Sequence, residues 1–562
     1  MVSTKWMREL SRMRNLRNPL ILCLTLLLAT SGLGEESHDS QGREVFLKTW
    51  RLVESNFFAP DLNGVDAEAV KQSYLDQIDG DPAQVLKVTN ESLSRLTASH
   101  TRLFHESEPL YYELLDIFGH GHLERKIRAR FDGRFPWYVG ILARIEQNTV
   151  KHVVPGGPAA NAGLLVADEV VSADGKAFHP IESFADKSGK PVTLEVKRDG
   201  ELLTLSVTPE VIQPREAFLK SITDSAKIIE EPPYKIGYVR MWSYAGDVYQ
   251  ERLAEILKGK LKDTDALLFD LRGSWGGASP DYAQLFLSQT EMVMKPRGRE
   301  PFVLKQPGYA EPLMILCDES VSSGKEILAY NLQKSGRAKV TGSPSRGAVL
   351  GGELHLLPHG YALYLARADV EVDGKSMEGL GVSPDHYLPE EYHFTAGDDD
   401  LIRNGKAYLV HDLIERDLKY RFFVDQQPRT KEHVRNVDRQ NQAWLKALLE
   451  NHGWPDREIY EEATTTAWLI AQHADNDLEF QKYALKLLSE AVDKGKALPK
   501  HRAYLQDRVL VNQGLPQIYG TQIKRENGII KPRTEIQDRE GVEERRRALG
   551  LPPLQEYMDS FK

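Results

Sequence analysis

Residues 313–327 read LMILCDESVSSGKEI. The apolar run from Leu313 to Cys317 predicts a buried strand, and the polar residues after it predict a tight turn into a helix that begins at Gly324. Ser323 would then lie beside the helix N-terminus, where free N–H groups and the positive end of the dipole stabilise an oxyanion. A serine there is also a common helix N-cap, so this segment alone leaves both roles open.

A second junction between a strand and a loop carries adjacent glycines. Residues 266–277 read ALLFDLRGSWGG, an apolar strand followed by a loop. Gly276 and Gly277 permit a close approach of the backbone and can direct an N–H group at a bound carbonyl oxygen. An ordinary strand-to-helix turn is the alternative for this segment by itself.

Two further segments supply groups for proton transfer. Ser99 and His100 stand in LTASHT (96–101), and Glu378 stands in MEGLGVSPD (377–385). An imidazole changes its charge near neutral pH, and a carboxylate can orient it. Taken alone, the first is an ordinary Ser-His pair and the second a solvated loop carboxylate.

The order of predicted elements divides the chain. Residues 43–130 are predicted helical, because apolar residues between Phe46 and Phe57 recur at helical spacing. Short β-type runs separated by Gly, Pro and Asp turns occupy 136–212. Strands and helices alternate over 235–390, which predicts an α/β domain, and a charged, mostly helical part follows. The predicted strands of the α/β part are 236–241, 266–271, 313–317, 338–341 and 361–366, and its predicted helices are 249–257 and 324–333.

Together, the four segments resemble one family, the C-terminal-processing and tricorn-type serine peptidases, over about residues 43–390. The resemblance implies an α/β multidomain protein. Its parts are an N-terminal helical segment, a PDZ-like β domain and a ClpP/crotonase-like α/β peptidase domain. The mostly α C-terminal part separately resembles an uncharacterised helical domain of bacterial proteins, which brings no activity with it. The expected domains are 43–130, 134–212, 213–395 and 430–562, and the N-terminal pattern described below adds a signal peptide at 1–34.

The resemblance also implies catalytic roles. In the Ser-Lys branch of the family, a lysine about 25 residues after the serine is the general base. Ala348 occupies that position here, which excludes a dyad of this form. The tricorn-like layout instead implies Ser323 as nucleophile and His100 as base, with Ser99 and Glu378 orienting the imidazole.

The oxyanion hole implied by the resemblance combines the N–H of Gly324 with one from Gly276 or Gly277. Lys325 is the competing base. Two residues past Ser323 on the same helix, it is expected to point away from the serine.

The β-rich part resembles a PDZ domain in two stretches. WYVGI (137–141) resembles the carboxylate-binding loop, in which Val139, Gly140 and Ile141 would present N–H groups to a C-terminal carboxylate while the peptide adds as a strand. VPGGPAANAGL (154–164) resembles the helix start that follows. A domain that only orients its neighbours is the alternative.

The N-terminus has the pattern of a targeting segment. Basic residues between Lys5 and Arg17 precede the apolar run from Leu20 to Leu28 and a stretch of small residues, as in a cleaved signal peptide. We therefore expect export to a bacterial periplasm or the exterior, with no stable membrane span after cleavage. An uncleaved anchor is the second choice, because the apolar run is shorter than the roughly 20 residues of a span. Only Cys317 would remain, so no internal disulfide can form.

Composition limits the partners. The net charge is −10, and no basic stripe is interleaved with aromatic residues, which argues against nucleic acid. Protein or peptide substrates are expected, and an oligomer stays open. We expect no cofactor and no metal, because paired-cysteine and His-Glu-x-x-His signals are missing and His473 with Asp475 lacks a third ligand at regular spacing.

The predicted function is therefore that of an exported serine endopeptidase that hydrolyses peptide bonds through an acyl-enzyme. Two other classes stay open. One is a non-catalytic protein that binds peptides or other ligands on the same scaffold. The other is a hydrolytic envelope enzyme that acts through its C-terminal domain.

Overall fold

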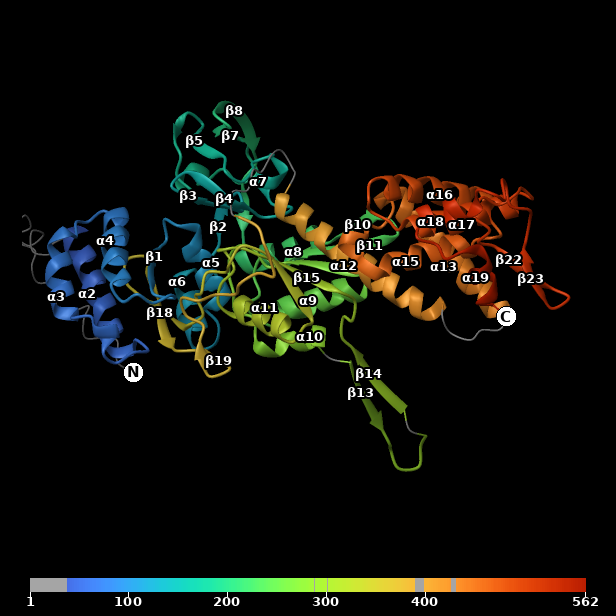
Figure 1. Ribbon diagram of the computed structural model, residues 1–562. Helices are drawn as coiled ribbons and strands as arrows, with labels where there is room; N and C mark the ends of the chain where they lie inside the picture. The colour runs from blue at the N-terminus through green and yellow to red at the C-terminus, as the bar shows by residue number, and fades with distance from the viewer. Residues whose placement is uncertain (1–37, 288, 301, 390–398, 426–430, 562) are drawn as a thin grey trace, which may run out of the picture.

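The computed structural model describes residues 38–561 except 288, 301, 390–398 and 426–430 (Figure 1). The predicted signal peptide, 1–34, lies outside these residues. Within the described part of the chain, no helix combines the length and the apolar character that a membrane crossing requires.

The N-terminal region is helical and ends in a strand. Phe46, Trp50 and Val53 are fully buried at its centre. They come from the first of three helices, α2 (His38–Asn56), α3 (Ala67–Tyr74) and α4 (Pro82–Ser94). The strand that follows, β1 (Arg102–His105), pairs antiparallel with β18 (Tyr361–Ala368). The sequence predicted only helices over 43–130 and missed β1, because four residues are too few for a periodic signal.

A six-stranded sheet forms the centre of the molecule. Its order is β10 (Lys227–Glu231), β11 (Tyr234–Arg240), β12 (Ala266–Asp270), β15 (Leu313–Cys317), β16 (Ala338–Gly342) and β21 (His386–Tyr387). Neighbours from β11 to β21 run parallel. Every residue of β12 and β15 is buried, as parallel strands covered on both faces require.

The two faces of this sheet carry different covers (Figure 1). On one, Ile315 of β15 belongs to a core with α8 (Pro214–Ser225), α9 (Asp247–Lys258) and α11 (Gly324–Lys334). On the other, Met314 and Leu316 belong to a core with α12 (Asp400–Asp425). The alternation along β15 follows from the period of two in a strand.

A separate β-rich unit carries its own core around Val170 and Val196. Its sheet order is β3 (Ala143–Glu146), β4 (Thr149–Val153), β5 (Glu169–Ala173), β7 (Val192–Arg198) and β8 (Glu201–Val207), with β6 (Lys176–Ala177) beside β5. Strand β2 (Tyr138–Gly140) pairs with β9 (Glu210–Ile212), and α7 (Pro158–Asn161) is one turn long. β3 is an edge strand of this sheet.

A third sheet joins the N-terminal region to the α/β part. Its order is β1, β18 and β17 (Gly351–Leu356), and β18 contains the predicted strand 361–366, which therefore lies outside the central sheet. Helices α5 (Pro109–Phe118) and α6 (Glu124–Arg130) follow β1, and a short pair, β19 (Glu371–Val372) and β20 (Lys375–Ser376), follows β18. After the turn α10 (Gln284–Leu287), the hairpin β13 (Gln289–Met294) and β14 (Phe302–Pro307) projects from the body (Figure 1).

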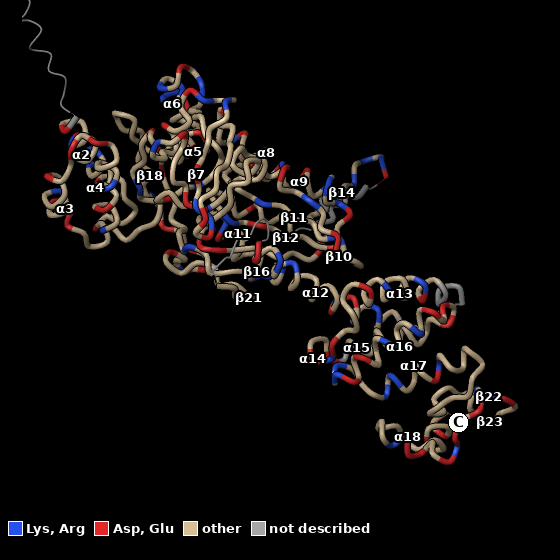
Figure 2. The backbone as a smooth tube through the Cα atoms, turned by 90° about the horizontal axis from the view of Figure 1, so that it is seen from above, with Lys and Arg blue, Asp and Glu red and all other residues tan. Residues whose placement is uncertain are grey.

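The C-terminal part is mostly helical and lies at the end of the molecule opposite α2–α4 (Figure 2). Its core is continuous with the α12 face of the central sheet, and α12 connects the two. The elements are α13 (Lys431–His452), α14 (Arg457–Tyr460), α15 (Thr464–His473), α16 (Leu478–Asp493), α17 (Pro499–Asn512), the hairpin β22 (Ile523–Glu526) and β23 (Ile529–Pro532), α18 (Val542–Ala548) and α19 (Leu554–Asp559).

Candidate active site

Ser323 lies where β15 turns into α11, as the sequence predicted. Its φ of 60° is in the left-handed region, which is rare for a residue with a side chain. Two hydrogen bonds hold this conformation: its N–H donates to the Ala348 carbonyl at 2.7 Å and to the Glu326 carboxylate at 2.9 Å. A strained backbone supported in this way is typical of functional positions.

The Glu326 carboxylate is buried and joins the Ser323 turn to a second segment. Besides Ser323, it accepts hydrogen bonds from the Ser345 hydroxyl at 2.6 Å and from the N–H groups of Gly347 at 2.7 Å and Ala348 at 2.9 Å. Four donors satisfy a charge that would otherwise be costly to bury. The path of residues 345–348 is therefore fixed relative to Ser323.

Ser99, His100 and Glu378 form a continuous hydrogen-bonded chain. The Ser99 hydroxyl lies 2.9 Å from Nδ1 of His100 and donates to Oε2 of Glu378 at 3.0 Å. Oε1 of the same carboxylate accepts the Ser99 N–H at 2.8 Å. Because the serine proton is committed to the carboxylate, the serine oxygen is free to accept Nδ1–H, which leaves the Nε2 lone pair of His100 available as a base.

Burial lowers the pKa of His100 to about 4, with Arg346 acting in the same direction and Glu378 in the opposite one. The imidazole is therefore neutral at pH 7, which a general base requires.

One cavity of about 590 Å³ brings the predicted groups together. Ser99, His100, Ser323, Gly276 and Gly277 all line it. No hydrogen bond joins His100 directly to Ser323 within the described chain. Such contacts often tighten only when substrate is bound.

The Gly276 loop lies directly against the serine turn. A Cβ atom on Gly276 would fall 2.6 Å from Cβ of Ser323 and 2.5 Å from the Ser322 carbonyl oxygen, so only glycine fits there. Gly277 has a φ of 83° and packs equally closely on Ala245. The backbone nitrogen of Gly324 is also near, 3.2 Å from the Cβ position of Gly276. The three glycines predicted for the oxyanion hole thus lie at one place.

Lys325, the competing base, is fully buried and occupied elsewhere. Its Nζ donates to the carbonyl oxygens of Gly273 at 2.8 Å, Trp242 at 3.0 Å and Leu271 at 3.1 Å. Burial lowers the pKa of Lys325 to about 7, yet three acceptors favour the ammonium form, because only that form has three N–H donors. Its role is to hold the loop that leads to Gly276.

The same loop has two more supports. The Gly273 N–H donates to the Ser320 hydroxyl at 2.7 Å. The buried Arg272 guanidinium pairs with Asp270 and Asp399, each at 2.7 Å. Asp399 also accepts the N–H groups that open α12, so the helix that begins the C-terminal part is attached to the active-site loop.

The residues predicted to bind a peptide carboxylate are partly engaged. Val139 and Gly140 belong to β2 and pair with β9, and the carbonyl of the buried Ile141 accepts the Ala159 N–H at 2.9 Å. The next strand, β3, has a free edge within the described sheet, where an extended peptide can add.

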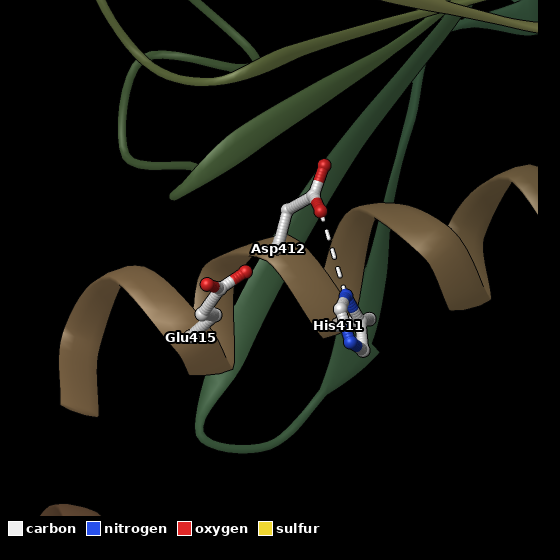
Figure 3. A group of neighbouring side chains, drawn as sticks. All are labelled: His411, Asp412 and Glu415. Atoms are coloured by element: carbon white, nitrogen blue, oxygen red, sulfur yellow. Dashed lines mark hydrogen bonds and ion pairs between the residues drawn. The ribbon is translucent and has the colours of Figure 1, made fainter. Parts of the chain in front are cut away.

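One group of side chains has the composition of a metal site, His411, Asp412 and Glu415 on α12 (Figure 3). Lys339 pairs with Asp412 at 2.8 Å, and Lys419 pairs with Glu415 at 2.5 Å. These lysines neutralise the two carboxylates, so we assign no metal to the group. Asp475, the other acid considered from the sequence, pairs with Arg508.

Sequence reasoning missed Glu326 and Ser345. Glu326 lies within the predicted helix 324–333 and Ser345 in the loop after the predicted strand 338–341, and nothing in their spacing distinguishes a buried polar residue from a surface one. The Glu three residues after Ser323 is the one available signal, because Glu at that position reaches back to the N-cap N–H.

Comparisons with known proteins agree with this architecture. Residues 138–208 match a PDZ domain, 235–388 match peptidase family S41, and 425–562 match a family of unknown function (DUF6624). A carboxyl-terminal-processing protease of Picosynechococcus sp. is 25% identical over 386 residues, 66% of this chain and 89% of the relative. The chloroplastic carboxyl-terminal-processing peptidase 3 of Arabidopsis thaliana is 26% identical over 378 residues, 62% of this chain and 70% of the relative.

Among solved structures, a photosystem II D1 C-terminal processing protease is 21% identical and covers 62% of this chain and 94% of its own, with a TM-score of 0.38. That score is too low to add to the argument. The sequence matches define the class, which is that of the serine-type peptidases. Within this class, the chain carries the peptidase domain of family S41 together with a PDZ domain and a C-terminal helical region, which confirms the predicted fold class and family.

The contacts of Lys325 lead to a stability prediction. Lys325→Met should lower the free energy of unfolding by at least about 2 kcal/mol, because a lost partner leaves buried carbonyl groups unsatisfied at about 1–3 kcal/mol each. Denaturant unfolding followed by fluorescence measures this. Lys334→Met, which alters an exposed lysine at the end of the same helix, is the matched control and should leave the midpoint nearly unchanged. Equal effects of the two substitutions would contradict the structural role of Lys325.

Proposed function

We propose that this chain is an exported serine endopeptidase whose nucleophile is Ser323 and whose general base is His100. The observation that carries the proposal is the cavity that both residues line, together with the hydrogen-bonded chain from His100 through Ser99 to Glu378. Ser323 is also the N-cap of α11, in a capping box with Glu326. An N–H accepted by its oxygen leaves the hydroxyl proton available for transfer to His100.

The chemistry follows from these positions. Nε2 of His100 accepts the hydroxyl proton of Ser323, and Oγ attacks the scissile carbonyl carbon. The negative charge that develops on the carbonyl oxygen is stabilised by the N–H of Gly324 and one N–H from Gly276 or Gly277. His100 then gives its proton to the leaving amine, and the C–N bond breaks.

The acyl-enzyme is hydrolysed by the same groups in reverse order. With the amine gone, His100 deprotonates a water molecule, which attacks the ester carbonyl and restores the Ser323 hydroxyl. Ser99, whose hydroxyl donates to Glu378, keeps Nδ1 of the imidazole protonated. This arrangement needs His100 to move toward Ser323 when substrate closes the cavity.

The PDZ domain is proposed to bind the C-terminal end of the substrate. The support is the free edge of β3 beside residues 139–141 and the position of this domain at the cavity: Arg144, Lys151 and His152 from β3 and β4 line it together with Ser323. A peptide that adds to β3 is therefore already near the nucleophile.

The proposed export of the protein is supported by the targeting pattern at residues 1–34, in which basic residues precede a short apolar run and small residues. N-terminal sequencing of the mature protein from the host envelope should give a start at about residue 35, after the predicted signal peptide, and a start at Met1 would contradict cleavage.

A second candidate function is a peptide-binding protein without catalysis. It is favoured by one observation, the lack of a direct hydrogen bond between His100 and Ser323 among the described residues. The two functions share the scaffold and differ in whether Ser323 reacts.

Ser323→Ala should lower peptide hydrolysis at least about 10³-fold and abolish labelling by a fluorophosphonate probe, because the attacking oxygen is gone. Peptide binding should persist. Ser322→Ala, one residue away and in the same cavity, is the matched control and should retain both activities. A wild-type protein that neither cleaves peptides nor reacts with the probe would leave only the binding function.

Ser99→Ala should lower kcat/KM about 10- to 100-fold without abolishing turnover, because the imidazole loses the group that fixes its tautomer. Wild-type kcat/KM should fall as pH decreases through about 4, where His100 becomes protonated. The variant should show this fall at lower pH, because the imidazolium loses an acceptor for Nδ1–H.

Ser107→Ala is the control for this experiment. It removes a Ser-His hydrogen bond of 3.0 Å, to Nδ1 of His105, outside the cavity lining. A rate and pH profile unaltered by Ser99→Ala would exclude Ser99 and Glu378 from the mechanism.

A further inference from the structure

The cavity beside Ser323 is more positive than the rest of the chain. Six cationic side chains line it, against four carboxylates, whereas the whole chain carries −10. The cations are Arg102, Arg144, Lys151, Arg240, Arg272 and Arg346. A cleft with an excess of one charge raises the local concentration of ligands of the opposite charge.

Most of the arginines in the cavity are already neutralised. Arg102 pairs with Glu108 at 2.9 Å, Arg144 pairs with Glu113 at 3.1 Å, and Arg272 pairs with two aspartates. Charges committed to a partner in the protein contribute little to binding a new anion.

Arg346 differs from them. Its side chain is exposed, and its Nε donates to the backbone carbonyl of Glu319 at 3.0 Å. Within the described residues, no carboxylate lies at ion-pair distance from it. A guanidinium has five N–H donors, so four remain for a ligand, and their fork matches a carboxylate.

The backbone around Arg346 is fixed relative to the nucleophile. Its N–H donates to the Val321 carbonyl at 3.1 Å, and its two neighbours, Ser345 and Gly347, are both bound to Glu326. The Ala348 carbonyl in turn holds the N–H of Ser323. Arg346 lines the same cavity as His100 and Ser323 from this fixed segment. Its charge also lowers the pKa of His100.

We propose that Arg346 determines specificity by binding a carboxylate of the substrate on the leaving-group side, within one or two residues of the scissile bond. The side follows from His100, which protonates the leaving amine, so groups next to the imidazole face the residues after the bond. The proposal rests on the proposed function. The carboxylate has two possible sources, an Asp or Glu side chain and the α-carboxylate of a short C-terminal segment.

The first experiment digests a proteome-derived peptide library with the full-length protein and identifies the cut sites by mass spectrometry. Wild type should be enriched at least about fivefold for a carboxylate within two residues after the cut. Arg346→Gln should lose the enrichment and still cut neutral sequences, and Arg346→Glu should favour Lys or Arg at these positions. An identical site preference of wild type and both variants would overturn the proposal.

The second experiment separates the two sources. Matched peptides carry Glu or Gln after the cut site, each with a free or an amidated C-terminus. A loss of at least about tenfold in kcat/KM on Glu→Gln assigns the side chain, and the same loss on amidation assigns the C-terminus. Equal rates for all four peptides would overturn the proposal.

Lys151→Gln is the matched control, because it removes one exposed charge from the same cavity. This substitution should change kcat/KM only slightly, and by the same factor for all four peptides. If Lys151→Gln lowered kcat/KM for the acidic peptides as much as Arg346→Gln does, the preference would come from the total charge of the cavity and not from a contact with Arg346. That result would contradict the proposal. Cleavage of neutral peptides by wild type and its loss in Ser323→Ala test the proposed function separately, and failure there overturns both.

Discussion

Two carboxylates, one buried and one half-buried, lie on either side of one short segment and hold Ser323 and His100 in a common frame. Glu326 fixes Ser345, Gly347 and Ala348 beside the Ser323 turn. One residue further, the Val349 N–H donates to Glu378 at 2.9 Å, and Glu378 binds Ser99. The segment 345–349 thus links Ser323 to His100 through hydrogen bonds alone, although 223 residues separate the two in sequence.

The oxyanion side of the site depends on a different set of charges. Lys325 and Arg272 are both fully or nearly buried and hold the loop before Gly276 from two directions. Burying a charge costs free energy, and apolar side chains at these positions would often give equal or greater stability. We therefore infer that the buried charges are kept because they fix the geometry of this loop. Asp399 pairs with Arg272 and also accepts N–H groups of the first turn of α12. The position of this loop is therefore also sensitive to how the C-terminal part packs on the sheet.

The sequence predicted the elements with strong local signals. The strand over 313–317 and the helix that begins at Gly324 agree with the structure, because an unbroken apolar run and a turn with glycine leave few alternatives. The grouping of Ser99, His100 and Glu378 came from family resemblance, since no local pattern relates residues so far apart. Three features depend on tertiary contacts, which leave no periodic signal in the sequence. They are strand β1, the separate sheet that contains β18, and the partners of Lys325 and Glu326.

Ala348 explains why the proposed catalytic unit includes the N-terminal region. It lies at the position of the base in the Ser-Lys layout, it is buried, and its backbone carbonyl accepts the Ser323 N–H. The α/β domain offers no base at that point, and the proposed proton acceptor, His100, comes from the turn between α4 and β1. That turn is held against the site by the pairing of β1 with β18, in the register that sets Arg102 opposite Tyr364, and by Glu378. Contacts between residues so distant in sequence form late and at a high entropic cost. In this chain, therefore, the proposed nucleophile acquires its base only when the N-terminal helices have docked, and any loosening of β1 from β18 would separate the two groups while the central sheet stays intact.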